Sequence, residues 1–103
     1  MRFLVKVTFP VEPANQAIKD PNFGSKMKQI LGDMKAEAAY FSTMNGQRGG
    51  YIIVSMDDVS KMSAIAEPFF LWMKADVEFH PVMTPDDLMK GGPGIEAAIK
   101  KWG

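Results

Sequence analysis

The dipeptide Asn45-Gly46 stands between two strand-like segments and is the feature that most restricts the fold of this chain. Both residues tolerate the positive φ angles of a type I′ turn, which joins two antiparallel strands through two residues. The segment before the turn, 36–44, is strand-like, and the segment after it, 49–56, has aromatic and β-branched residues through its middle. The sequence therefore predicts a β-hairpin at the centre of the chain.

Two further strands are predicted near the ends of the chain. Residues 2–9 alternate at the period of a half-buried strand, with Phe3, Val5, Val7 and Phe9 on one side. Residues 73–83, MKADVEFHPVM, alternate in the same way. Successive side chains of a strand point to opposite faces, so its polar residues share one side and its apolar residues the other. The polar side carries Asp76, Glu78 and His80, opposite Ala75, Val77 and Phe79.

Helical patterns fill the intervals between these strands. We expect a short turn at 14–19, bounded by Pro13 and Pro21, and a firmer helix at 25–34. A third helix should begin at Asp57 or Asp58 and break at Pro68, with a second turn at 69–72. Thr84 and Pro85 predict a helix start, Gly91-Gly92 a stop, and residues 95–102 a short amphipathic C-terminal helix.

The order of these elements predicts an α+β fold of the ferredoxin-like type, βαββαβ, as a single domain over residues 1–103. Such a domain has a four-stranded antiparallel sheet of order 4-1-3-2 with its helices on one face. The other face would remain apolar in part and uncovered, so we expect a homodimer or higher homo-oligomer in which two sheets form a dimeric α/β barrel.

Composition excludes several classes of function. The chain has no cysteine, which rules out disulfides, thiolate chemistry and Cys-based metal sites. Twelve basic residues balance twelve acidic ones, so no nucleic-acid partner is expected, and Arg48-Gly49-Gly50 is interpreted as a flexible hairpin arm. No apolar run approaches the roughly 20 residues of a spanning helix, so no membrane partner is expected and a cytoplasmic location is the default.

Polar residues of the first and fourth strands form the candidate site. Lys6, Asp76, Glu78 and His80 should share the open face, where cross-strand neighbours lie about 5 Å apart and Lys6 could pair with Glu78. His80 and Glu78 are the candidate catalytic residues, because imidazole titrates near neutral pH. The candidate ligand-binding residues are Lys6, Tyr40, Ser42 and Asp76.

The same residues have plainer interpretations. A lone histidine before a proline is often a hydrogen-bonded interface residue, and charges on an edge strand discourage aggregation. Asp76, Glu78 and His80 are widely spaced along a strand and have no second histidine beside them, so no metal and no cofactor is expected.

Two segments, AEAAYFSTMNGQRGGYIIVSM and AEPFFLWMKADVEFHPVMTPDDLMKGGPGIEAAIKKWG, carry a family resemblance. They resemble small bacterial proteins of the dimeric α/β-barrel superfamily, broadly similar to muconolactone-isomerase-like and YCII-related domains. The resemblance implies a ferredoxin-like protomer and a homodimer. It implies no particular reaction, because that superfamily includes isomerases, cofactor-free monooxygenases and members without known activity.

The expected function is a small-molecule site on the open sheet face of a homodimer. An enzyme built this way would carry out proton transfer or cofactor-free oxidation on an aromatic or lactone-like metabolite. The alternative is a non-catalytic dimeric binding or accessory module, in which the polar residues only pair across the interface.

Overall fold

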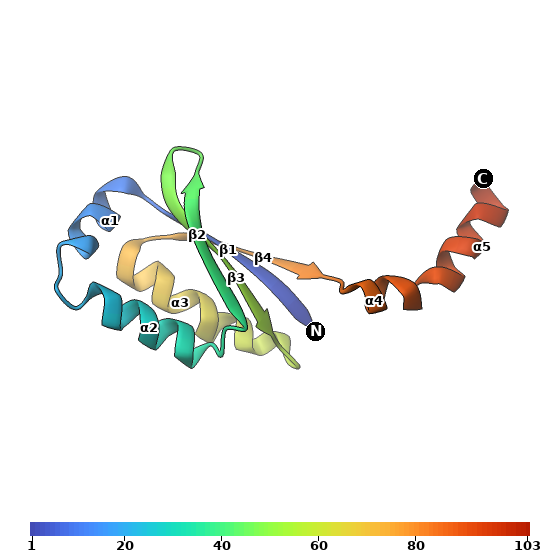
Figure 1. The fold of residues 1–103 in the computed structure, drawn as a ribbon, viewed down its shortest axis with the longest axis horizontal. Helices are drawn as coiled ribbons and strands as arrows, with labels where there is room; N and C mark the ends of the chain where they lie inside the picture. The colour runs from blue at the N-terminus through green and yellow to red at the C-terminus, as the bar shows by residue number, and fades with distance from the viewer.

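The computed structural model describes residues 1–103 as one four-stranded sheet with helices on one side of it (Figure 1). The elements in chain order are β1 (Arg2–Phe9), α1 (Val11–Ile18), α2 (Phe23–Asp33), β2 (Ala38–Met44), β3 (Gln47–Ser55), the 3₁₀ turn η1 (Val59–Lys61), α3 (Met62–Met73), β4 (Asp76–Val82), α4 (Pro85–Lys90) and α5 (Gly92–Trp102). The strands lie in the order β2-β3-β1-β4, and every neighbouring pair is antiparallel. The predicted α+β fold and sheet order are confirmed, and the arrangement is consistent with a ferredoxin-like fold.

The hydrophobic core lies between the sheet and the helices α1, α2 and α3, which cover the same face (Figure 1). The alternation predicted for the first strand is confirmed, because its odd-numbered residues are all buried. Across β1 and β3, Val5 pairs with Ile52 and Phe3 with Val54, so these four side chains share the covered face. The even-numbered residues of β1 consequently point to the opposite, open face.

The central hairpin forms as predicted. Asn45 and Gly46 have φ angles of 51° and 77°, which are the positive values that a type I′ turn requires. The third strand begins at Gln47, earlier than the expected start at Gly49, so Arg48 joins Gly49 and Gly50 within the sheet, and all three pair with β1 and β2. The interpretation of this tripeptide as a flexible arm is therefore wrong.

Two predicted helix breaks are also wrong, for different reasons. Pro68 lies inside a continuous α3, because Ile65, Phe69 and Met73 on either side of it are all buried in the core and hold the helix on the sheet. Pro13 lies in the first turn of α1, where the backbone N–H groups have no partner within the helix, so a proline there removes no hydrogen bond.

The last two helices, α4 and α5, form an arm that extends away from the sheet (Figure 1). The arm begins with a reciprocal cap, in which the Thr84 backbone N–H donates to Asp87 Oδ2 at 3.0 Å and the Asp87 N–H donates to Thr84 Oγ1 at 3.1 Å. The radius of gyration is 17.2 Å, whereas a compact chain of this length has about 13 Å. The predicted C-terminal helix is present, and it does not pack on its own sheet.

Candidate functional site

The open face of the sheet carries side chains in rows that run across all four strands. The strand registers place Tyr40, Tyr51, Lys6 and Glu78 in one row from β2 through β3 and β1 to β4. Two rows flank it, which are Ala38–Ile53–Leu4–His80 and Ser42–Gly49–Thr8–Asp76. All six predicted site residues therefore lie on the open face, as the alternation indicated.

The central row combines aromatic and charged groups. Tyr40 and Tyr51 are opposite each other on β2 and β3, and Tyr51 is opposite Lys6 on β1. Directly opposed side chains have Cβ atoms about 5 Å apart, so the two phenol rings and the ammonium group are neighbours. In this row, an aromatic surface therefore lies beside the half-buried side chain of Lys6.

His80 and Glu78 contact each other directly on β4. His80 Nε2 lies 3.2 Å from Glu78 Oε2, and the two side chains are 53% and 60% exposed. In the tautomer with its proton on Nε2, His80 donates to the Glu78 carboxylate and its Nδ1 has a free lone pair. Lys6 is opposite Glu78 in register but forms no ion pair, so the predicted Lys6–Glu78 pair is not formed.

The row at the hairpin end is partly filled by Met44. The Met44 side chain is buried over Gly49, where a Cβ would lie 2.7 Å from its Cε, and its sulfur accepts a contact from Thr8 Oγ1 at 4.0 Å. Ser42, in contrast, is exposed at the edge of the sheet. Met44 therefore separates Ser42 from the charged residues of β1 and β4.

A pocket of about 380 Å³ joins part of the open face to the tip of the hairpin. It brings together Lys6, Asp76 and Glu78 of the predicted set, and adds the polar side chains of Asn45 and Gln47. His80, Tyr40 and Ser42 do not line this pocket. The predicted residues thus divide into a group of three in the pocket and a group outside it.

Sequence reasoning did not propose Tyr51, Asn45 or Gln47 as residues of the site. Tyr51 could have been found from the turn alone, because a two-residue loop at Asn45-Gly46 pairs position 40 with position 51. Asn45 was assigned to the turn and Gln47 had no assigned role, and nothing in their local pattern points to a pocket.

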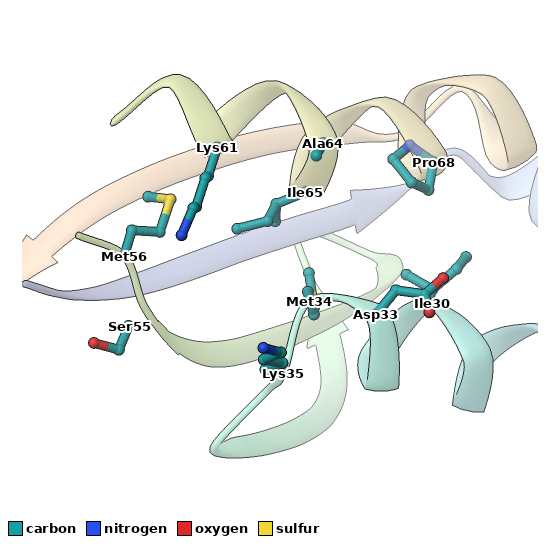
Figure 2. A pocket seen from close by; sticks show the side chains of 10 residues that line it. All are labelled: Ile30, Asp33, Met34, Lys35, Ser55, Met56, Lys61, Ala64, Ile65 and Pro68. Atoms are coloured by element: carbon teal, nitrogen blue, oxygen red, sulfur yellow. The ribbon is translucent and has the colours of Figure 1, made fainter. Parts of the chain in front are cut away.

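A second cavity, of about 510 Å³, lies on the covered side between α2 and α3 (Figure 2). Figure 2 shows Lys61 and Lys35 on opposite sides of it, with Met34 and Ile65 between them. The Lys61 ammonium is already engaged by Asp57 at 2.7 Å, which raises the pKa of Lys61. No residue predicted for the site lines this cavity.

No group of three or more His, Asp or Glu side chains is placed so that it could hold a metal ion. No helix is both long and apolar enough to cross a bilayer.

Fold and open face together define a small α+β domain with an antiparallel sheet covered by helices on one side only. The family described as Domain of unknown function (DUF3303) matches residues 1–94, and the chain belongs to this family. The match extends from β1 through α4 and ends at the start of α5. A search of curated proteins finds no match to this chain.

Proposed function

We propose that the protein is a homodimer whose open sheet faces pack together and enclose a site for a small organic molecule. The row Tyr40–Tyr51–Lys6–Glu78 carries the proposal, because it places aromatic rings and charges side by side on a face that no helix covers. Leu4 and Ile53 in the next row add apolar surface to the same face. A contiguous partly apolar surface of this kind marks an interaction site, and a twofold partner is the commonest way to cover it.

The arm supports self-association independently of the sheet. Its apolar side chains are spaced along α4 and α5 and lie mostly in solvent, with Trp102 80% exposed. They are Leu88, Met89, Ile95, Ile99 and Trp102. A helix with one apolar stripe is stabilised by packing that stripe on another surface. A second copy of the chain offers such a surface where this protomer's own sheet does not.

The chemistry of the open face favours an aromatic or lactone-like ligand with an anionic or carbonyl oxygen. The tyrosine rings would form its walls, and the Lys6 ammonium would pair with the oxygen. His80 would take a proton from the ligand at Nδ1 while Glu78 holds Nε2. Proton transfer is therefore preferred over cofactor-free oxidation, because the titratable side chains on this face are acids and bases.

The test is a panel of aromatic acids and lactones screened by thermal shift against the purified protein and three variants. Lys6→Met and His80→Ala should each reduce the shift caused by a binding acid. Lys19→Met removes a lysine outside the site and should leave that shift unchanged. Equal responses from all four proteins would remove Lys6 and His80 from the site.

One observation favours the alternative of a non-catalytic dimer. His80 and Glu78 satisfy each other and are more than half exposed, as charges that protect an edge strand often are. In that case the protein would dimerise through the open face, and no member of the panel would bind. Dimer formation and ligand binding, measured separately, distinguish the two functions.

A further inference from the structure

A third cavity, on the covered side of the sheet, differs from those above in being almost entirely apolar. It has a volume of about 290 Å³ and lies between the helices α1 and α2 and the β2–β3 hairpin. We call it the hairpin pocket. Its walls include the buried side chains of Phe9, Met27 and Met73. This volume is just below the roughly 300–1,000 Å³ typical of drug-sized ligand sites, so the pocket suits a small ligand.

The outer wall of the hairpin pocket is Phe41 of β2, which packs over Gly50 of β3. Gly50 faces the helices between Val7 and Phe41, and a Cβ at Gly50 would lie 3.1 Å from the Phe41 ring. Phe41 therefore lies against the strand as one wall, although it is 53% exposed. Ile18, on the α1 side, is 49% exposed, so apolar surface remains in solvent at the mouth.

One charged side chain lies at this mouth. Arg48 extends from β3 to α1, where its Nη1 donates to Asn15 Oδ1 at 2.9 Å. Arg48 forms no ion pair with any carboxylate, and Asn15 is its only side-chain hydrogen-bond partner. A guanidinium has five N–H donors in a planar fork that fits a carboxylate in bidentate geometry. The remaining donors are therefore available to an anion at the rim.

We infer that the hairpin pocket binds an apolar carboxylic acid, with its chain or ring among Phe9, Met27 and Phe41 and its carboxylate on Arg48. The apolar walls supply the affinity, and the single cation at the rim fixes the orientation. The proposal does not depend on the open-face site, because Ser42, at the edge strand, is the only residue predicted for that site that also lines the hairpin pocket. Medium-chain fatty acids and alkyl-substituted aromatic acids are the classes that fit.

Trp72 is a natural fluorophore beside the hairpin pocket. Phe23 lines it and packs on Trp72 with ring centroids 5.2 Å apart. The other tryptophan, Trp102, is on the exposed arm, so Trp102→Phe removes its signal. We expect decanoate to change the Trp72 fluorescence of the Trp102→Phe protein in a saturable way. Decanol, which has the same chain without the charge, should bind about ten- to a hundredfold more weakly.

Variants of Arg48 distinguish the contribution of its charge to the affinity from the contribution of the apolar walls. Arg48→Met should weaken the binding of decanoate by about ten- to a hundredfold and leave the binding of decanol unchanged. Arg48→Lys should restore part of the lost affinity for decanoate. Arg2→Met, which removes an arginine bound to Glu37 elsewhere on the sheet, should change neither affinity. NMR shifts induced by decanoate should fall on Ile18 and Phe41.

Two results would overturn the inference. The first is equal affinity for decanoate and decanol in the unmodified protein. The second is a set of induced NMR shifts that centres on Tyr40 and Tyr51, which would place the acid on the open face. That second result would support the open-face site, so failure of one proposal is distinguishable from failure of the other.

Discussion

Tyr40 and Tyr51 lie directly opposite each other on the open face of the sheet, one on each strand of the central hairpin. Tyr51 also faces Lys6 on β1, so it stands in the middle of the row that crosses all four strands. The turn at Asn45-Gly46 sets this relationship, because a two-residue loop leaves only one register for the strands it joins. A local turn signal thereby builds the centre of the proposed interface.

Replacing Tyr51 by lysine should weaken self-association by more than about tenfold, because a second ammonium beside Lys6 would be desolvated and uncompensated in the interface. Size-exclusion chromatography with light scattering measures the change. Val59→Lys is the matched control, since Val59 is 67% exposed in η1, away from the sheet face. An unchanged mass for Tyr51→Lys would exclude the open face as the contact surface.

Removing α5 by ending the chain after Gly91 should also weaken self-association, because its apolar stripe would no longer pack on the partner. The sheet should remain intact, since α5 is not among the elements that surround the core. Amide chemical shifts in β1 and β3 test the second point, and sedimentation velocity tests the first. Loss of the folded spectrum would show instead that α5 stabilises its own protomer.

Gly49→Ala should destabilise the protein by about 1–3 kcal/mol, because the new Cβ would overpack a closed site. That Cβ would lie 2.7 Å from Met44 Cε and 2.9 Å from the Val7 carbonyl oxygen. Gly32→Ala, in α2, meets nothing within 4 Å and should stabilise the protein by about 0.5–1 kcal/mol. Urea denaturation compares the two, and similar effects of both changes would contradict the packing described for Met44.

The start of the arm should loosen only in acid. The hydrogen bond from the Thr84 backbone N–H holds the pKa of Asp87 below its ordinary value of 3.8. Because the folded-state pKa of Asp87 is lowered, its ionised carboxylate stabilises the cap fully at pH values above 3.8. This stabilisation is lost as the pH falls through the lowered pKa. The Thr84 amide resonance should therefore titrate with a midpoint below 3.8, and this response should vanish in Asp87→Asn. A midpoint at or above 3.8 in the unmodified protein would contradict the cap.

The fold was predictable because its signals are local and agree with one another. The Asn45-Gly46 turn, the alternation of β1 and the stripe in α2 each specify an element by its own residues. Pro68 misled the prediction because the core contacts of Ile65 and Phe69 outweigh the hydrogen bond that a proline removes. That competition depends on tertiary packing, which a local pattern does not contain.

The face of each site residue was predictable, whereas its partner was not. Alternation placed Lys6 and Glu78 opposite each other, and the register confirms it. The Glu78 carboxylate nevertheless bonds to His80, because two residues apart on one strand is also within side-chain reach. Similarly, the apolar stripe of α5 was evident, but its position away from the sheet depends on the direction in which the chain leaves β4. Both outcomes rest on side-chain rotamers and on backbone direction beyond the strand.

The mass of the native protein in solution tests the central claim most directly, because everything proposed for the open face requires a second copy there. The protomer has a mass of 11.4 kDa. Sedimentation equilibrium at micromolar concentration should give about twice that value. A mass of 11.4 kDa at every concentration would contradict the account.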